Sequence, residues 1–536
     1  MHTYMETIQR AADDAARSVA PPESLDVSGV VDVGELADLP AVAKEIIELQ
    51  KAADGTLEAC RQLLAKLYVY EYVRSLQGAD ADADSGTKAA TECTEELVAS
   101  LCAIRPTVDV WEEVEGDDGD GFNEVKPTPN LTIFTATVSL CLTILDGQLT
   151  ASPDLLSSAS LRAAVAAALA VYGDPSAVWA TSANAAAVER IRSANSVSLM
   201  TTETLTDLLL SVRRMSAFQR PPGTVTAMGR RAVRVPRVQK DVDVDIESER
   251  RRGVEMGEGL AIVRFVVTGM EPSAVQQNWH LIVPAILTAL DDGDILTKAH
   301  ACDVLTCLLG VVDTAFLSRT GLAAVFEEAV TPCLHFLPPL TPVGQARKSF
   351  TAGVNALVAL GGTKGAGGDE EMYKALDKVL REGVFRAVTY AGENVRMMEV
   401  VVDLAAGVVR KLGMRSVRHL KNLVPLCTKP LLSPFVTAYL PLAVCATTTL
   451  QEVVRNCWPR VEDYNAVVLE AAVFCWVRVQ QSEDEGEEME RLRHELRVLM
   501  ALLAGANRES GWMKQARQKV EQRGQGLAGL FADVSV

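Results

Sequence analysis

The sequence predicts an all-α protein built as an α-solenoid of antiparallel helix pairs, in two lobes. Apolar residues recur at three- and four-residue spacing along almost the whole chain, which is the helical period. Short corners with Gly, Pro or Asp separate these segments, and one helix pair with its corners takes about 40 residues, as in HEAT and armadillo repeats. At 536 residues the chain is too long for one compact core.

Taken in order, the periodic segments predict a first group of helices, a gap, and then a second group. The first group covers 1–19, 39–53, 55–77, 88–104, 131–146, 152–172, 175–194 and 197–215. The second covers 257–269, 274–290, 295–312, 321–336, 342–360, 371–390, 394–412, 414–428, 433–456, 462–481, 487–504 and 508–523. A single helix pair cannot bury its apolar face alone, whereas a stack of pairs can. A closed helical bundle is the alternative architecture.

The gap between the groups predicts the domain organisation. Residues 216–253 combine Pro, Gly and charge runs, which is typical of a linker. We therefore expect an N-terminal helical lobe over 1–215 and a C-terminal helical-repeat lobe over 254–536. Further solvated loops are expected at 78–88, 111–130, 361–371 and 482–490.

The composition narrows the function classes. The hydrophobic fraction is 48% but aromatics supply only 5%, which suits many similar helices packed through small side chains. The net charge of −18 predicts repulsion from nucleic acids and anionic lipids, so we expect neither as a partner. We find no apolar stretch that reaches the roughly 18 residues of a membrane span.

The cysteines and the first residues indicate the compartment. Eleven cysteines, mostly inside apolar runs, argue against a secreted disulfide framework and favour reduced thiols in the cytosol or nucleus. The first 20 residues contain early acids and no apolar core, so we expect an amphipathic helix rather than a targeting signal.

The stretch NWHLIVPAILTALDDGDILTKAHACDVLTCLL, residues 278–309, predicts one hairpin of the stack. Trp279 opens the first helix and can wedge between neighbours, and Pro284 would kink it. The pair Asp291 and Asp292 forms the corner, and Asp294 caps the second helix. Lys298 is the single cation of the stretch.

This stretch resembles the signature of the Tel-two-interacting protein two family, in its fungal-like form. The similarity continues through LPPLTP (337–342), REG (381–383), the long segment RSVRHLKNLVPL (415–426) and NCWPR (456–460), and it covers roughly 275–480. The resemblance implies a non-enzymatic helical-repeat scaffold, the smallest subunit of the triple-T (TTT) complex. It also implies binding to two larger helical-repeat subunits. Through them it implies work with the Hsp90 chaperone and its adaptor on the stability of phosphatidylinositol 3-kinase-related kinases, in cytoplasm and nucleus.

Two signature corners have both a structural and a docking interpretation. Pro338, Pro339 and Pro459 start or stop helices, and Trp458 fills a gap between repeats in the structural interpretation, which we favour. In the other interpretation these corners form a docking ridge. Trp476, in VFCWVRV (473–479), belongs to the same structural signature.

The segment 396–426 is basic in an acidic chain. It predicts either an electrostatic dock for an acidic partner or a solvated face whose cations pair with neighbouring acids. The candidate docking residues are Arg396, Arg415, Arg418, His419, Lys421 and, at the NCWPR corner, Arg460.

Two further segments suggest regulation. GRRAVRVPRVQK (229–240) is either a nuclear-localisation motif or, as we favour, a charged linker. Ser482 precedes a run of acids that would suit an acid-directed kinase, although a solvated loop is the simpler interpretation.

Catalytic, metal and cofactor sites are not predicted. The six histidines are far apart and no HExxH, G-x-S-x-G or GK[ST] phosphate loop occurs, so we expect no catalytic, cofactor-binding or metal-ligating residue. Two other classes remain as alternatives. An importin-like transport adaptor would have regular N-terminal repeats, and a hydrolase or transferase would show buried, convergent His, Asp or Ser groups.

Overall fold

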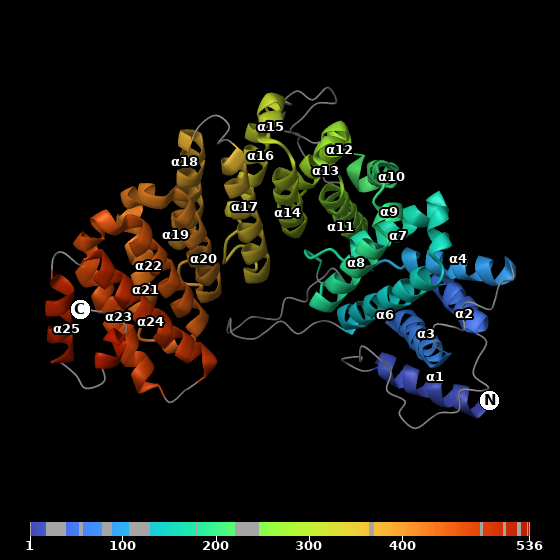
Figure 1. Ribbon diagram of the computed structural model, residues 1–536, viewed down its shortest axis with the longest axis horizontal. Helices are drawn as coiled ribbons and strands as arrows, with labels where there is room; N and C mark the ends of the chain where they lie inside the picture. Colours follow the sequence, from blue (N-terminus) through green and yellow to red (C-terminus); the bar gives the residue numbers. More distant parts are fainter. Residues whose placement is uncertain are drawn as a thin grey trace. The chain divides into compact units, whose positions relative to one another are not determined.

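The computed structural model describes residues 2–17, 39–52, 57–77, 88–106, 129–177, 179–219, 246–363, 369–482, 486–507, 511–522, 527–532 and 534. Within these ranges every regular element is a helix and no strand is present (Figure 1). The all-α prediction is confirmed.

The chain forms two compact units, Met1–Val312 and Asp313–Val536. This division differs from the expected linker at 216–253. Helix α11 (Ile246–Gly269) already begins inside that segment and packs against α10 (Thr202–Arg214) and α7 (Ala159–Tyr172). The chain after the gap therefore returns to the first stack. Most of the predicted linker, including the candidate localisation motif at 229–240, lies outside the described residues.

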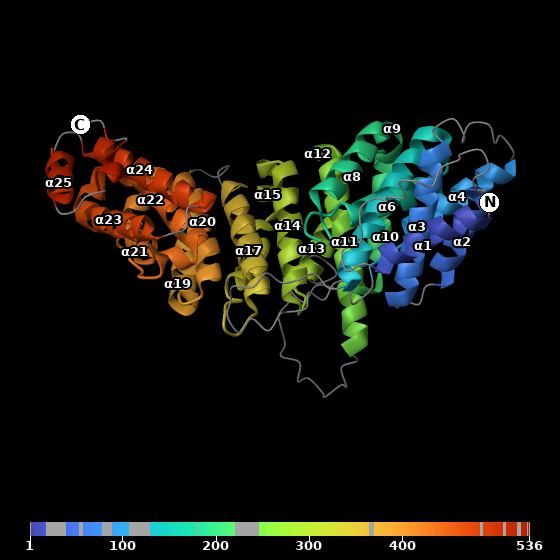
Figure 2. The ribbon, with the colours of Figure 1, turned by 90° about the horizontal axis from the view of Figure 1, so that it is seen from below.

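Unit 1 is a stack of helices that pack on neighbours close in the sequence, such as α2 on α3, α3 on α6, and α11 on both α13 and α14 (Figure 2). Its other elements, besides α7, α10 and α11, are α1 (His2–Arg17), α2 (Leu39–Ala52), α3 (Leu57–Gln77), α4 (Lys88–Ala103), α6 (Pro129–Ala151), η2 (Pro153–Ser157), α8 (Ser182–Ala194), α9 (Ser196–Leu199), η3 (Ser216–Phe218), α12 (Pro272–Gln277), α13 (Trp279–Leu290) and α14 (Ile295–Val311).

Unit 2 is a stack of helix pairs in which α17, α20, α22 and α24 are successive neighbours (Figure 1). Its elements are α15 (Thr314–Thr320), α16 (Ala323–Val330), η4 (Thr331–Leu334), α17 (Val343–Thr363), α18 (Asp369–Lys378), the π-helical turn η6 (Val379–Val384), α19 (Phe385–Ala391), α20 (Val395–Leu412), η7 (Gly413–His419), α21 (Leu420–Leu431), η8 (Val436–Ala438), α22 (Leu440–Val461), η9 (Glu462–Tyr464), α23 (Asn465–Gln481), α24 (Glu487–Ala506), α25 (Trp512–Glu521) and η10 (Leu527–Phe531).

Side-chain contacts between layers of unit 2 show the repeat length. Arg410 pairs with Glu452, 42 residues later, at 3.4 Å, and the amides of Asn465 and Asn507 bond to each other across the same separation. Equivalent positions in neighbouring pairs are therefore about 40 residues apart, as the sequence spacing predicts.

The 278–309 hairpin forms as predicted, with roles for its charged residues. The Asp294 carboxylate caps α14 by accepting from the Thr297 amide at 2.7 Å. Lys298 Nζ donates to the Leu290 carbonyl at 2.6 Å, which satisfies an oxygen left free at the end of α13. At the corner, Asp292 pairs with Arg252 of α11 at 2.8 Å, whereas Asp291 is the last, C-capping residue.

Pro284 lies within the first helix of this hairpin without interrupting it. Pro284 lies inside α13 with its ring exposed, and α13 runs unbroken from Trp279 to Leu290. Trp279 is half-buried at the first position of that helix. Proline has no amide hydrogen, so the carbonyl four residues earlier loses its helical hydrogen bond. On the solvent side of the helix water can bond to that carbonyl instead, which keeps the loss of stability small.

Trp476 and most of the cysteines lie in the core of the helical stacks, and one of the two signature prolines at 338–339 is also buried. Trp476 in α23 is 1% exposed, with the Arg497 guanidinium 5.4 Å from its ring centroid. All eleven cysteines are described and are free thiols, and burial raises the pKa of Cys475 to about 12. Pro338 is buried and Pro339 is exposed at the corner between η4 and α17, joined by a cis peptide bond.

Helix α6 corrects the membrane analysis. No apolar stretch of the sequence was expected to be long enough to span a bilayer, but among the described residues α6 meets that length and composition. Half of the apolar window in α6 is buried, and α6 packs against α3, α4 and α8. A core helix has the same composition, and here the packing accounts for it.

Threonine hydroxyls inside the helices bond to their own backbone. Thr137, Thr288, Thr428 and Thr447 each donate to the carbonyl four residues earlier, at 2.7–3.0 Å. All four threonines are buried, and a buried hydroxyl without a hydrogen-bond acceptor would destabilise the fold. The bond to the helix's own backbone supplies that acceptor.

Candidate partner-docking surface

The basic segment of α20 and α21 is divided by the fold. Arg396 lies in the first turn of α20 and Arg410 in its last turn, and the helix has 18 residues. Because a helix rises about 1.5 Å per residue, these two arginines are about 20 Å apart. The predicted cluster therefore belongs to two opposite ends of the helix pairs in unit 2.

At the C-terminal end of α20, acidic side chains from neighbouring helix pairs form ion pairs with several of the predicted docking residues. Arg415 pairs with Glu370 at 2.5 Å, and its guanidinium lies 3.9 Å from the centre of the Tyr373 ring. This hydrogen bond lowers the pKa of Glu370. Arg418 approaches Asp377 at 3.5 Å. Both arginines therefore fit the interpretation of a paired, solvated face.

His419 differs from the surface role expected for it. Its ring is buried, and its Nε2 lies 2.6 Å from Asp377 Oδ1. Asp377 lies in α18, so its contact with His419 ties η7 to that helix, and Asp377 also accepts from Arg381 at 2.9 Å. His419 is a positioning residue for the η7 turn and leaves the set of residues that a partner could touch.

Three cations at this end remain open. Lys411, Lys421 and Arg460 are exposed, and none forms an ion pair with a carboxylate in the described part of the chain. They surround the η7 turn and the end of α22, which pack against each other.

Trp458 overturns the structural interpretation of NCWPR. We expected it to fill a gap between repeats, but 56% of its surface is exposed. The reason lies in the local backbone, because Cys457 leaves the helical region at φ −112° and ψ 16°, one residue before Trp458. Cys457 itself is buried, and Pro459 follows at the exposed end of the kinked helix. The kink thus buries the cysteine and exposes the tryptophan.

Met414 lies at the same end of unit 2 and is 63% exposed. It follows Gly413, whose φ of +56° turns the chain out of α20. We call Lys411, Met414, Lys421, Trp458 and Arg460 the Trp458 edge. Exposed tryptophan and methionine among arginine and lysine are the residue types enriched at protein interfaces.

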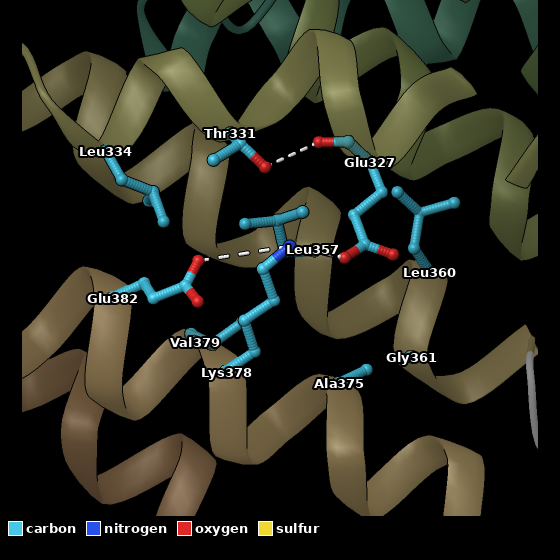
Figure 3. A pocket seen from close by; sticks show the side chains of 10 residues that line it. All are labelled: Glu327, Thr331, Leu334, Leu357, Leu360, Gly361, Ala375, Lys378, Val379 and Glu382. Carbon is cyan, nitrogen blue, oxygen red and sulfur yellow. Dashed lines mark hydrogen bonds and ion pairs between the residues drawn. The ribbon is translucent and has the colours of Figure 1, made fainter. Parts of the chain in front are cut away.

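One pocket of about 340 Å³, open solvent included, lies between α16, α17 and α18 in unit 2. Figure 3 shows Lys378 extending across it, with Glu327 on one side and Glu382 on the other. Lys378 Nζ lies 2.9 Å from Glu327 and 3.9 Å from Glu382, and the hydrogen bond to Glu327 raises the pKa of Lys378. The charges of the pocket satisfy one another, so it presents no unpaired group to a ligand.

A polar cluster in unit 1 contains the residue types that the hydrolase alternative requires. His300 Nε2 lies 2.8 Å from Asp174 Oδ2, and both residues are buried. Ser176 Oγ, however, donates to Asp303 at 3.2 Å and accepts from Arg264 at 3.2 Å. In the described residues no hydrogen bond joins the serine to the histidine. The arrangement therefore lacks the nucleophile–base pair of acyl-transfer enzymes.

The cluster holds the loop after α7 to α14 and α11. The Ser176 amide also donates to Asp174 at 3.0 Å. Burial acts to raise the pKa of Asp174, but the charge of His300 and the two hydrogen bonds outweigh it and lower that pKa. Burial raises the pKa of Asp303 instead. Among the described residues, no group of three or more His, Cys, Asp or Glu is arranged to hold a metal ion.

Sequence reasoning missed both the polar cluster and Met414. The cluster joins residues 264, 300 and 303 to a Gly-Asp-Pro-Ser corner more than 80 residues earlier, and no local spacing reveals it. Exposure of Met414 depends on the positive φ of Gly413, for which the only sequence signal is the Gly at a helix end. The acids after Ser482 lie outside the described residues.

Comparison with known proteins gives one family and a set of distant structures. The model of the Tti2 family matches residues 165–438, or 274 of the 536 residues. The structure of the karyopherin Kap121p bound to the SUMO protease Ulp1p aligns with 98% of this chain and 48% of that chain, at 10% identity and a TM-score of 0.37. Importin beta aligns with 96% of this chain and 68% of its own, at 10% identity and a TM-score of 0.42. The chain thus spans about half the length of the karyopherin.

Proposed function

Because the chain belongs to the Tti2 family, we propose that it is a non-enzymatic scaffold that binds the two larger helical-repeat subunits of the TTT complex. Family membership makes the chain a TTT subunit in general. We further propose that the complex, with the Hsp90 chaperone and its adaptor, matures and stabilises phosphatidylinositol 3-kinase-related kinases in the cytoplasm and nucleus. No cofactor takes part.

The mechanism that fits this role is mass action. A partner that binds only the folded state stabilises it, by about 2.7 kcal/mol when its free concentration is 100 times the dissociation constant. Each subunit would protect the others, and the assembled scaffold would raise the amount of folded kinase.

The Trp458 edge is the observation that supports this proposal. Removing an exposed tryptophan from water on binding gains more than burying most other side chains, and such residues dominate interface energies. Trp458 stands beside open cations, which can add charge complementarity and speed association with an acidic partner.

The test uses the full chain and the two purified larger subunits. We expect Trp458→Ala to weaken binding to one subunit at least tenfold in a titration measured by calorimetry or interferometry, and Trp458→Phe to weaken it less. Val197→Ala is the matched control, since Val197 is 90% exposed in unit 1. Unchanged affinity of Trp458→Ala for both subunits would contradict the assignment of this edge.

The cellular part of the proposal has a separate readout. Cells that carry only Trp458→Ala should contain less of the kinases, at unchanged messenger levels, with the scaffold itself still folded. Recovery of a small GTPase and varied cargo with the intact chain, in place of two large subunits, would favour the transport adaptor.

A further inference from the structure

The opposite ends of the helix pairs in unit 2 expose three large apolar side chains at three successive corners. Leu340 lies between η4 and α17, Tyr390 lies in the last turn of α19 before α20, and Phe435 lies between α21 and α22. They are 96%, 63% and 77% exposed. A single exposed apolar residue needs no explanation, but the same exposure at three neighbouring corners forms a series.

Side-chain contacts between the corners show that they form one continuous edge. Arg386 of α19 reaches back to His335 of the first corner at 3.4 Å and lies 5.6 Å from the centre of the Tyr390 ring. Glu399 in the first half of α20 accepts from Arg347 of α17 at 3.2 Å and from Tyr439 of the third corner at 2.7 Å. The corners are therefore adjacent layers, which we call the Leu340 edge.

The Leu340 edge is cationic. The segments 331–349, 385–399 and 427–443 contain five Lys or Arg and two Glu, a net charge of +3 in a chain of net charge −18. One of the two carboxylates, Glu399, is already engaged by Arg347 and Tyr439. Burial of Tyr439 and its bond to Glu399 raise the pKa of that phenol to about 12, so it remains a donor.

Two of the cations have no acid of their own. Arg386 and Lys429 form no ion pair with a carboxylate in the described part of the chain. Arg386 flanks Tyr390, and Lys429 lies in the last turn of α21 just before the Phe435 corner. Each open cation therefore accompanies one exposed aromatic ring.

Neighbouring helices pack about 8–10 Å apart, so three corners extend over about 20 Å. That length matches roughly 14 residues of α-helix. Apolar side chains along the middle with cations at the sides are complementary to an amphipathic helix with an apolar face and acidic flanks.

We propose that the Leu340 edge is a second docking surface, separate from the Trp458 edge, and that it binds an acidic amphipathic helix of a partner protein. The two edges lie at opposite ends of α20. Unit 2 thus holds two partners at once without competition between them. This inference goes beyond the proposed function and does not depend on membership in the TTT complex.

The test uses a fluorescent 14-residue helical peptide with leucines on one face and glutamates at its flanks, titrated to about 1 mM of the full chain. A second peptide, in which lysines replace the glutamates, is the control for charge. We expect the acidic peptide to bind and the lysine peptide to bind at least tenfold more weakly. We expect the triple variant L340S, Y390S, F435S to lower the affinity for the acidic peptide at least tenfold.

A charge variant keeps the apolar residues in place and guards against misfolding. R386E together with K429E should also weaken the acidic peptide at least tenfold and strengthen the lysine peptide. Trp458→Ala should change neither affinity. Circular dichroism melting checks that each variant is folded.

Three outcomes would overturn the proposal: no binding of the acidic peptide by the intact chain, equal binding of both peptides, or a loss on Trp458→Ala as large as that of the triple variant. Sedimentation of the intact chain adds a fourth, since self-association abolished by the triple variant would identify a second copy as the occupant. Failure of the intact chain to bind either larger subunit would count against the proposed function alone.

Discussion

The polar cluster around Asp174 in unit 1 and the Trp458 edge in unit 2 contain residue types that both suggest function, yet they are organised in opposite ways. In the cluster, His300, Ser176, Asp303 and Arg264 use one another as partners inside the protein. At the edge, Trp458 and its neighbouring cations face solvent. Residue type alone therefore does not separate a structural site from a docking site. What separates them is whether the polar and aromatic groups already have partners inside the protein.

The two signature tryptophans sharpen this comparison most. Trp476→Ala removes a buried ring and should lower the free energy of unfolding by about 4 kcal/mol, whereas Trp458→Ala should change it by less than about 0.5 kcal/mol. Urea unfolding followed by circular dichroism measures both. A large loss for Trp458→Ala would mean that the exposed ring supports the fold after all, and the edge would lose its functional interpretation.

The polar cluster predicts the next effect. Asp174→Asn replaces the buried carboxylate that accepts from the Ser176 amide and faces His300, and it should cost about 2 kcal/mol, since a buried polar group that loses its partner keeps its desolvation penalty. The exposed Asp154→Asn is the control, with little expected change.

The pH dependence of the same variant gives an independent check. The pKa of Asp174 is lower in the folded chain than in the unfolded chain, so its contribution is present above the unfolded pKa of about 3.9 and is lost as pH falls through the folded value. The difference in stability between wild type and Asp174→Asn should therefore shrink below about pH 4. A difference that stays constant on acidification would show that the cluster acts through shape rather than charge.

Gly413 tests how the Trp458 edge is built. Its φ of +56° and ψ of −136° suit glycine, so Gly413→Ala should cost about 1–3 kcal/mol and shift Met414. Gly407→Ala is the matched control, because that helical position is open to an added methyl group. If Gly413→Ala melts as the wild type does, the turn has an alternative conformation and Met414 is not fixed by it.

The smallest effect belongs to the paired surface charges. Arg415→Ala should leave the thermal midpoint and both subunit affinities close to those of the wild type, because its partner Glu370 is exposed and screened by salt. A marked loss of subunit binding would restore Arg415 to the docking set.

Much of the fold was predictable because it depends on local periodicity. The helix of 395–412 was predicted at 394–412, and the cap by Asp294 was predicted as such. Helix α15, a seven-residue helix opened by an Asp313 cap, was not predicted, since two turns are too short to show a period. The helix expected from residue 175 begins only at Ser182, because the chain makes the Asp174 corner before it.

The surfaces were less predictable because they depend on which layers meet. The basic segment looked like one cluster in sequence, but α20 separates its ends, and acids such as Glu370 and Asp377 reach it from an earlier pair. The Leu340 edge has no signal in any single segment, since its cations come from three corners. The assignments of Arg396, Lys421 and Arg460 as docking residues stay predictions.

The self-bonded threonines have a consequence for how such a sequence changes with time. A buried hydroxyl that bonds only to its own helix leaves no neighbour short of a partner when it is lost, so alanine, valine or cysteine can replace Thr137 or Thr447 at small cost. The sequence of each layer can then change independently of its neighbours while the helices keep their spacing. Over time such a stack loses any consensus sequence shared by its repeats. The repeat length of about 40 residues is then the only periodic signal that remains.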